Sequence, residues 1–332
     1  MSERDPAETA TLAGVGEFGL VDRIARATAQ GPAVLIGPGD DAALVAAPDG
    51  RVVASTDLLL EGRHFRTDWS TGYQVGRKAA AQNLADVAAM GAAPTALLVG
   101  LAAPGSLPVA WARELAAGLA DECALVDASV AGGDTTRGES ILIAVTALGD
   151  LGGRAPVLRS GAHPGDVVAV AGELGWSACG YELLTRGADG SKKALARHRS
   201  PQPPYAQGPA AAVAGATAMI DVSDGLLADL GHIARESAVA IDLDPAAFTI
   251  PDELRASAGQ FGIDPLRWIL TGGEDHALAA CYPTTGDVPH GWTVVGTVSH
   301  CSASKRSADQ SAPWVTVAGS AWIGPQGWDH FA

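Results

Sequence analysis

Short apolar runs alternate with longer alanine-rich stretches along this chain, a pattern typical of a mixed α/β protein. The apolar runs predict strands at 52–56, 94–101, 141–148, 167–171, 219–222, 239–243, 292–298 and 314–317. The alanine-rich stretches predict helices at 73–90, 108–123, 177–184 and 224–237. Pro108 suits the start of a helix, and Gly91 suits the left-handed residue that ends one.

A segment rich in Gly and Pro, residues 149–165, lies near the middle of the 332-residue chain. Such a composition is typical of a linker, and the chain length suits about two domains of roughly 100 to 200 residues each. We therefore predict two domains, residues 1–150 and 151–332.

The charge balance excludes several classes of protein. There are 22 Lys and Arg residues against 37 Asp and Glu residues, so the formal net charge is −15. This charge would repel nucleic acid or an anionic membrane, and a small anionic ligand would need cations to mediate its contact. The chain is 47% hydrophobic and 18% charged, which excludes an intrinsically disordered protein.

Three features indicate a cytoplasmic protein. Residues 1–10 are polar and acidic, unlike a signal or transit sequence. No apolar run approaches the roughly 18 residues of a membrane span. The four cysteines (Cys123, Cys179, Cys281 and Cys301) form no CxxC pair, which fits reduced thiols and not a disulfide or zinc framework.

Six short segments combine glycine or polar oxygen donors with carboxylates near the ends of predicted elements. They are GPGDDAAL at 37–44, STDLLLEGRHF at 55–65, NLADVAAMGA at 83–92, GGDTTRG at 132–138, IDVSDGLLADL at 220–230 and TGGEDH at 271–276. Each has an ordinary structural interpretation beside a chemical one.

Ser55, Thr56 and Asp57 follow an apolar run, at the point where we expect the strand to end. Strand ends commonly face a ligand crevice in α/β folds, and three oxygen donors suit Mg²⁺. The alternative is an ordinary turn made of Ser, Thr and Asp. Asp40 and Asp41 leave the same choice, between a metal ligand and a solvated acidic turn.

Two further segments place polar side chains on predicted helices. Asn83 and Asp86 share one helix face, which is either an exposed stripe or a buried face that binds something. Asp221 and Asp224 bracket Ser223 where a strand turns into a helix. Ser223 and Asp224 either cap that helix or lie where its free N–H groups favour a phosphate.

GGDTTRG and TGGEDH share a Gly-Gly-acid core. Each is either a plain turn or a place where the backbone approaches a ligand and the acid holds a metal. Two like charges about 4 Å apart repel by about 4 kcal/mol at an effective dielectric of about 20. If the acidic segments meet, bound divalent cations are therefore required.

Several common motifs do not apply. GVGEFG at 14–19 has the spacing of a dinucleotide-binding motif, yet it follows a polar tail and no strand, so we interpret it as a false match. The sequence contains no GxxxxGKS or GxxxxGKT phosphate loop, no HExxH zinc motif and no GxSxG nucleophile elbow.

An ordered set of motifs runs from Gly16 to Phe331: GEFGL, GPGDDAAL, STDLLLEGRHF, NLADVAAMGA, GGDTTRG, RSGAHPGD, RHxxPxP, IDVSDGLLADLGHI, TGGEDH and GWDHF. This order resembles the thiamine-monophosphate kinase family, which belongs to the ATP-binding superfamily of aminoimidazole ribonucleotide synthetase. The resemblance implies two α/β domains and a homodimer formed through the N-terminal sheets. It also implies transfer of the γ-phosphoryl group of ATP to thiamine monophosphate, giving thiamine diphosphate and ADP.

Matched position by position, the resemblance implies a set of site residues. Metal ligands would be Asp41, Ser55, Thr56, Asp57, Asp86, Asp134, Asp221 and Asp224, with Asp40 adjacent. ATP contacts would come from Gly133, Asp134, Arg159 and Ser223. Thiamine monophosphate contacts would come from His64, Glu274 and Trp328. The Trp328 ring would stack on the thiamine heterocycles, or would simply pack the tail onto its domain.

The implied mechanism uses several Mg²⁺ ions that bridge carboxylates to phosphates, with Arg159 as a protein cation. Because the acceptor is already a phosphate oxygen, no catalytic base is named. Three places depart from the family pattern: Arg63 in place of Asn, Pro204 in place of Arg, and His276 with Ala277 in place of Tyr and Glu. We expect these departures to affect the substrate side and not the metal ligands.

Two other functions are alternatives. Another ATP-dependent synthetase of the superfamily would share the fold, although the N-terminal reactive Cys of selenophosphate synthetase and the C-terminal Cys of the hydrogenase-maturation family are missing from this sequence. A non-catalytic acidic metal-binding protein would bind divalent ions without binding nucleotide.

Overall fold

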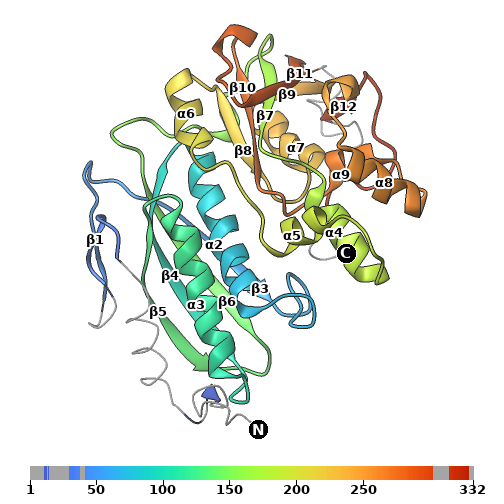
Figure 1. Ribbon diagram of the computed structural model, residues 1–332. Coiled ribbons are helices and arrows are strands. Elements are labelled where there is room, and N and C mark those ends of the chain that lie inside the picture. The colour runs from blue at the N-terminus through green and yellow to red at the C-terminus, as the bar shows by residue number, and fades with distance from the viewer. Residues whose placement is uncertain (1–10, 13, 15–29, 38–41, 302–313, 329–332) are drawn as a thin grey trace. The chain divides into compact units, whose positions relative to one another are not determined.

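The computed structural model describes residues 11, 12, 14, 30–37, 42–301 and 314–328. The chain divides into two compact units, and each contains its own β-sheet (Figure 1). Unit 1 comprises Met1–Val87 and Ala93–Gly153, and unit 2 comprises Ala88–Ala92 and Arg154–Ala332. The mixed α/β class predicted from the hydrophobic pattern is confirmed.

Unit 1 is built on a four-stranded sheet with the order β3-β6-β4-β5. Its strands are β3 (Val53–Leu60), β4 (Ala93–Ala103), β5 (Ser129–Arg137) and β6 (Leu142–Asp150). β4 and β5 are parallel, and the other neighbours are antiparallel. Helices α2 (Gly72–Ala89) and α3 (Val109–Ala124) lie over one face of the sheet (Figure 1). A ribbon of β1 (Val34–Ile36) and β2 (Leu44–Val45) packs beside Ala96 and Ala131.

The face of this sheet away from α2 and α3 carries exposed apolar side chains. Side chains alternate between the two faces along a strand, so Leu59 of β3 points into the core and Leu58 points away from it. Leu59 is completely buried, whereas Leu58 is 55% exposed. Leu98 of β4 is 38% exposed, and its partner in the sheet register is Thr146. We call this surface the open sheet face; Leu58, Leu98 and Thr146 define it.

Unit 2 is built on a six-stranded sheet with the order β12-β9-β11-β7-β10-β8, in which only β12 and β9 are parallel among the described residues. Its strands are β7 (Val167–Ala171), β8 (Ala218–Val222), β9 (Val239–Leu243), β10 (Ala277–Tyr282), β11 (Trp292–His300) and β12 (Val315–Val317). The sheet has one apolar cluster around Leu226, Leu230 and Ile233, and another that includes Ala211 and Met219. It is therefore covered on both faces.

The helices of unit 2 contribute to different apolar clusters. They are η2 (Arg159–Gly161), α4 (Trp176–Arg186), α5 (Lys192–Arg199), α6 (Gln207–Ala214), α7 (Leu226–Glu236), η3 (Pro245–Ala247), α8 (Asp252–Phe261), α9 (Pro265–Thr271) and η4 (Thr285–Asp287). α7 supplies the first apolar cluster of the sheet, and α6 supplies Ala211 to the second. A separate cluster joins α4, α8 and α9 through Trp176, Leu254 and Trp268.

All eight predicted strands and all four predicted helices are present, with some ends shifted. The bounds predicted for β7 and β9 are those observed, and Gly91 has the left-handed φ of +75° that ends a helix. The prediction missed β1, β2, β5, β10 and helices α5, α6, α8 and α9. β10 reads ALAACY and is buried throughout, so it shows neither the alternation nor the β-branched residues of a typical strand.

All four cysteines are free and buried. Burial raises the pKa of Cys123 and of Cys281 to about 12, so both remain neutral thiols at physiological pH. Among the described residues, no helix combines the length and the apolar character that crossing a bilayer requires.

Candidate active site

The first group of site residues lies where β3 meets α2 in unit 1. The Ser55 hydroxyl donates a hydrogen bond to a carboxylate oxygen of Asp86, with an O···O distance of 2.5 Å. The backbone N–H of Asp57 donates to the side-chain oxygen of Asn83 at 3.1 Å. β3 is an edge strand, so Asn83 satisfies an N–H group that the sheet leaves unpaired. Asn83 is completely buried, which rules out the exposed polar stripe.

We predicted that the strand ends at the Ser-Thr-Asp segment. That prediction is wrong, because β3 continues to Leu60. The turn interpretation is also wrong. Within the strand, Ser55 faces α2, and Thr56 points to the opposite face of the sheet. The Thr56 hydroxyl donates to the Val145 carbonyl at 2.9 Å and accepts from the Thr146 hydroxyl at 3.1 Å. The structure therefore brings Ser55, Asp57 and Asp86 to one face and leaves the Thr56 side chain on the other.

These donors fit a hard cation. Ser55, Asp57 and Asp86 offer only hydroxyl and carboxylate oxygens, the ligand type that Mg²⁺ prefers. Asp41 and Asp40, the other candidates from the N-terminal half of the sequence, lie outside the described residues. Within the described part of the chain, no three or more His, Cys, Asp or Glu side chains are grouped as a metal site.

The GGDTTRG segment is a strand and not the predicted turn: it forms the second half of β5. A side chain at Gly133 would lie 1.9 Å from the Val99 carbonyl oxygen, so glycine is required for the close approach of β4. Asp134 is exposed and pairs in register with Gly100, which in turn pairs with Ala144 and so with Leu58. This register places Asp134 on the side of the open sheet face.

A second acidic group follows β8 in unit 2. Asp221, at the end of this strand, is buried, and Asp224 lies in the turn that leads into α7. The predicted capping role of Ser223 and Asp224 is wrong, because the N-cap is Gly225 and no side chain caps it. Instead, one carboxylate oxygen of Asp229 accepts from the N–H groups of Asp224 and Gly225, at 3.1 and 3.0 Å.

Asp229 is a carboxylate that sequence inspection missed. Burial, together with the nearby charge of Asp221, raises its pKa to about 7. Its position five residues after Asp224, at the start of an amphipathic helix, resembles that of many surface acids, so spacing alone does not distinguish it. Burial and the neighbouring carboxylates therefore disfavour the charged form of Asp229.

The TGGEDH segment forms a loop, residues 272–276, in which each polar residue has a separate partner. The backbone N–H of Glu274 donates to the Ser223 carbonyl at 2.7 Å, and that of His276 donates to the Val222 carbonyl at 3.0 Å. A side chain at Gly273 would lie 2.5 Å from the Ser223 carbonyl oxygen, so this glycine approaches the protein's own backbone. The plain-turn interpretation is therefore the better description of the two glycines.

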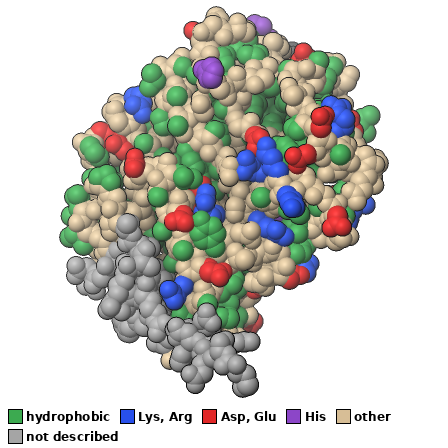
Figure 2. All heavy atoms as spheres, viewed as in Figure 1, with side chains coloured by type: hydrophobic (Ala, Val, Ile, Leu, Met, Phe, Trp, Pro, Cys, Tyr) green, Lys and Arg blue, Asp and Glu red, His purple; other side chains and the backbone are tan. Residues whose placement is uncertain are grey.

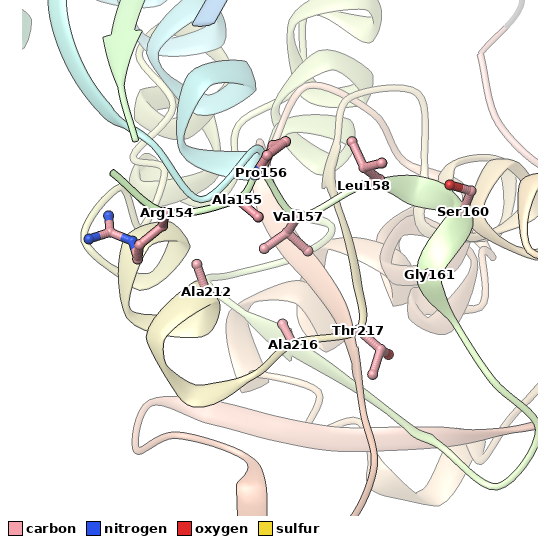
Figure 3. Close-up of a pocket in the computed structure, with 10 residues that line it drawn as sticks. All are labelled: Arg154, Ala155, Pro156, Val157, Leu158, Ser160, Gly161, Ala212, Ala216 and Thr217. Carbon is pink, nitrogen blue, oxygen red and sulfur yellow. The ribbon is translucent and has the colours of Figure 1, made fainter. Parts of the chain in front are cut away.

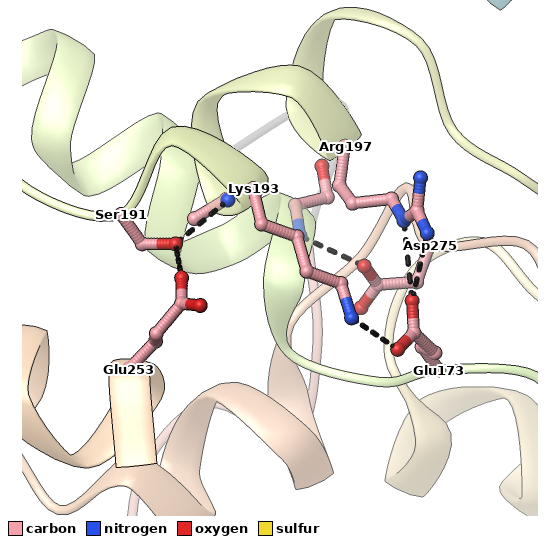
Figure 4. Close-up of polar contacts among 8 residues, drawn as sticks. Glu173, Ser191, Lys193, Arg197, Glu253 and Asp275 are labelled. Carbon is pink, nitrogen blue, oxygen red and sulfur yellow. Dashed lines mark hydrogen bonds and ion pairs between the residues drawn. The ribbon is translucent and has the colours of Figure 1, made fainter. Parts of the chain in front are cut away.

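Asp275 fastens this loop to α4. Its two carboxylate oxygens accept from the N–H groups of Gly175 and Ser177, at 2.6 and 2.8 Å, as Figure 4 shows for one of these bonds. Burial raises the pKa of Asp275 to about 7, although both backbone hydrogen bonds act in the opposite direction. Asp275 therefore satisfies free N–H groups at the start of α4.

Glu274 and His276 both have a left-handed backbone, with φ of +64° and +52°. This conformation is unfavourable for residues other than glycine, and such strain concentrates at functional sites. Nδ1 of His276 lies 3.1 Å from a carboxylate oxygen of Asp221, and both side chains are buried. We expected the departure at His276 to affect the substrate side; in the structure its side chain contacts Asp221, a predicted metal ligand.

The predicted substrate residues lie in both units. His64 accepts from the Leu60 N–H through Nδ1 at 3.0 Å, so its other ring nitrogen carries the proton. Glu274 lies 3.5 Å from Nδ1 of His198, a residue that we did not single out from the sequence. Trp328 is half exposed, and its ring meets that of Tyr181 at 6.3 Å in an edge-to-face arrangement. The Trp328 ring therefore contacts α4 and keeps part of its surface exposed.

One hollow of unit 2 lies apart from these substrate residues. A hollow of about 540 Å³ is lined mainly by apolar residues, together with Arg154, Ser160 and Thr217 (Figure 3). The Thr217 hydroxyl bonds to Asp166, and the Arg154 guanidinium is directed away from the other lining side chains. Arg159, the predicted ATP contact, is exposed in η2 next to this hollow.

The raised pKa of Asp229 predicts how the stability of the folded protein depends on pH. Its folded-state pKa of about 7 exceeds the ordinary 3.8, so the folded state holds the proton over this interval and the unfolded state does not. The stability contributed by this group therefore falls as the pH rises from about 4 to about 7. Asn at this position keeps one oxygen that accepts both N–H bonds and does not ionise.

We therefore expect Asp229→Asn, in the presence of EDTA, to raise Tm at pH 8 by several times more than at pH 5. Differential scanning calorimetry measures the difference. Asp244→Asn is the control, because Asp244 accepts one backbone N–H at an exposed turn. Parallel Tm profiles for wild type and Asp229→Asn between pH 5 and pH 8 would contradict the assignment.

Comparison with known proteins places this geometry in a family. Residues 39–151 match the family model described as AIR synthase related protein, N-terminal domain. The chain is 51% identical to the thiamine-monophosphate kinase of Mycobacterium tuberculosis strain H37Rv, over 98% of this chain and 94% of that protein.

Two solved structures agree with this result. The thiamine-monophosphate kinase of Stenotrophomonas maltophilia K279a has a TM-score of 0.77 at 32% identity, covering 91% of this chain and 96% of that one. The structure of AaThiL complexed with AMPPCP and TMP has a TM-score of 0.76 at 30% identity, covering 97% and 99%. Because the sequence identity extends over almost the whole chain and the fold agrees, the chain belongs to the thiamine-monophosphate kinase family.

Proposed function

We propose that this chain transfers the γ-phosphoryl group of ATP to thiamine monophosphate and releases thiamine diphosphate and ADP. The observation that carries the proposal is the 51% identity with the Mycobacterium tuberculosis kinase over 98% of the chain. A relative of the same fold is known in complex with AMPPCP, an ATP analogue, and TMP. The four buried thiols are consistent with a reducing compartment such as the cytoplasm.

Magnesium ions are the cofactor in this proposal. Asp41, Ser55, Thr56, Asp57, Asp86, Asp134, Asp221 and Asp224 are the proposed ligands, with residues 1–150 forming the ATP- and metal-binding domain and residues 151–332 completing the substrate site. When bound, the ions neutralise phosphate charge and hold the two phosphates in line. The Thr56 side chain points to the face opposite Ser55 and Asp57, so its hydroxyl does not reach a cation that those two residues share.

The protein's own residues then supply binding and orientation. Gly133, Asp134, Arg159 and Ser223 are the proposed ATP contacts, and His64, Glu274 and Trp328 the proposed thiamine monophosphate contacts. His64 presents an N–H group, which suits a phosphate oxygen. No side chain needs to remove a proton from the acceptor, since a phosphate oxygen is already anionic at neutral pH.

The open sheet face supports a homodimer formed through the sheets of unit 1. Leu58 and Leu98 are exposed on a regular, mostly apolar surface, which a second copy of the same sheet can bury. The Asp134 side chain lies on this side of the sheet, so pairing would bring two acidic positions to the interface and favour bound cations.

Asp57→Asn tests the function and its metal requirement together. Removing the carboxylate charge while keeping the backbone N–H bond to Asn83 should lower kcat/KM by about a hundredfold or more. Thiamine diphosphate is measured after incubation with MgATP and thiamine monophosphate, with free thiamine as a parallel acceptor. Asp68→Asn is the control, since Asp68 is an exposed partner of Arg66.

If Asp57→Asn kept the wild-type turnover, the proposal that Asp57 of β3 binds a metal ion would be wrong. If the wild type forms no thiamine diphosphate although MgATP stabilises it more than Mg²⁺ alone, another synthetase of this superfamily is the correct function. If MgATP adds nothing to the effect of Mg²⁺, the chain is a non-catalytic metal-binding protein.

Leu58→Arg tests the dimer. A charge in the centre of an apolar interface carries a large desolvation cost, so we expect this variant to be monomeric by light scattering where the wild type is dimeric. Leu125→Arg is the matched control, because Leu125 is 63% exposed at the end of α3. Identical masses for wild type and Leu58→Arg would contradict this interface.

A further inference from the structure

Asp221, one of the proposed metal ligands, is a buried carboxylate held by one side chain. The residue is 4% exposed and lies near the end of β8. Nδ1 of His276 lies 3.1 Å from Oδ2 of Asp221, and the His276 side chain is buried as well. Within the described part of the chain, this is the one hydrogen bond that the Asp221 carboxylate makes. The position of the carboxylate therefore depends on His276.

The alternation of side chains along β8 places this carboxylate on the sheet face away from α7. Ile220 and Val222, the neighbours on either side, belong to the apolar cluster that α7 supplies. Asp221 therefore points to the opposite face, which carries Met219. Leu278 of β10, its partner in the register, is also buried in the cluster of that face. A charged group beside these apolar side chains needs a hydrogen-bond partner to be stable there.

The backbone holds His276 in the position that makes this bond. His276 directly precedes β10, and its N–H donates to the Val222 carbonyl at 3.0 Å, so it extends the pairing of β10 with β8. The N–H of Glu274 donates to the Ser223 carbonyl at 2.7 Å and holds the same loop on β8. The left-handed φ of +52° is uncommon outside glycine, and Asn, Asp and His adopt it most readily. The His276 ring is therefore fixed against the end of β8.

The hydrogen bond orients the carboxylate of Asp221. A carboxylate accepts hydrogen bonds and donates none, so Nδ1 of His276 carries the proton and donates to Oδ2. Fixing one oxygen fixes the plane of the carboxylate, and hence the direction of the other oxygen, Oδ1. Side chains that hold a metal ligand in this way orient the ligand and raise the affinity of the site for its metal.

The donors around this turn fit a magnesium ion. Asp221 and Asp224 offer carboxylate oxygens and Ser223 offers a hydroxyl oxygen, and Mg²⁺ prefers such ligands. A ring nitrogen suits zinc, copper or nickel better, so His276 acts on the carboxylate and not on the ion. The family pattern has Tyr at this position, so the ring nitrogen is a point at which this chain departs from that pattern.

We propose that His276 is a positioning residue, whose Nδ1–H holds one carboxylate oxygen of Asp221 so that the other oxygen binds a Mg²⁺ ion. This proposal rests on the proposed function and adds the residue that orients one of its metal ligands. It predicts that loss of the Nδ1–H donor weakens the binding of Mg²⁺ and leaves the binding of thiamine monophosphate unchanged.

Calorimetric titration of the full chain with Mg²⁺ alone tests the proposal. Asp221→Asn identifies the part of the binding that requires this carboxylate, because that part should disappear in the variant. His276→Leu removes the donor, so the affinity of the same part should fall by about tenfold or more. His276→Asn has a side chain of the same size and branching, suits the left-handed backbone and supplies an N–H donor near the position of Nδ1, so its affinity should stay within about threefold of the wild type.

Thr217→Val is the matched control from the same unit. The Thr217 hydroxyl donates to Asp166 at 2.6 Å, and Asp166 is a buried carboxylate outside the proposed ligands. This variant therefore also removes a donor from a buried carboxylate while it keeps the shape of the side chain. We expect a lower Tm and an unchanged affinity for Mg²⁺. A loss of affinity in His276→Leu alone then reports the orientation of Asp221 and not the stability of the unit.

Steady-state kinetics separates the metal from the substrate. In His276→Leu, the free Mg²⁺ concentration that gives half-maximal formation of thiamine diphosphate should rise by about tenfold or more. The KM for thiamine monophosphate at saturating Mg²⁺ should change by less than about threefold. His276→Asn should resemble the wild type in both quantities.

The proposed function and the role of His276 can fail separately. If the wild type forms no thiamine diphosphate, the proposed function fails, whereas titration with Mg²⁺ alone still measures the role of His276. If Asp221→Asn binds Mg²⁺ as the wild type does, or if His276→Leu keeps the wild-type affinity, the role of His276 is wrong. If His276→Leu and His276→Asn lose affinity equally, the residue is structural and the positioning role is also overturned.

Discussion

The proposed substrate side of unit 2 depends on one strained loop, residues 272–276. Asp275 accepts two backbone N–H bonds at the start of α4, Glu274 faces His198 on α5, and His276 contacts Asp221 at the end of β8. Two left-handed residues other than glycine keep these three side chains pointing in different directions. One short loop therefore sets the positions of a helix start, of the proposed substrate contact Glu274 and of a predicted metal ligand.

In unit 1 the positions of the site residues depend on the alternation of side chains along the edge strand β3. β3 directs Ser55 toward α2, where Asp86 receives its hydrogen bond, and directs Leu58 to the open sheet face. The same strand thus carries oxygen donors for a cation on one side and an apolar surface on the other. The chain is strongly acidic and yet is proposed to act on two phosphate-bearing substrates. The oxygen donors on β3 suit this role, because carboxylates bind phosphates only through cations.

Much of the fold was predictable because hydrophobic runs of strand and helix length identify those elements directly. The strands β5 and β10 were missed because glycine and alanine give no strand signal, although Gly133 is required by the close approach of Val99. The motif residues could be identified from the sequence, but the contacts between them and the sheet faces on which they lie could not. Thr56 lies on the opposite face from Asp57, and His198, Asp229 and Asp275 become significant only through contacts between residues far apart in the chain.

Hydrogen exchange of Asp275→Ala, followed by mass spectrometry, measures most directly whether this loop holds α4 in place. Removing the carboxylate that accepts two backbone N–H groups at the start of α4 should accelerate exchange of the amides of α4 and α5 by about tenfold or more, and leave β3 and β6 unchanged. Asp264→Ala, which removes a cap from α9, should loosen that helix alone. Unchanged protection of α4 and α5 in Asp275→Ala would contradict the central role of the loop.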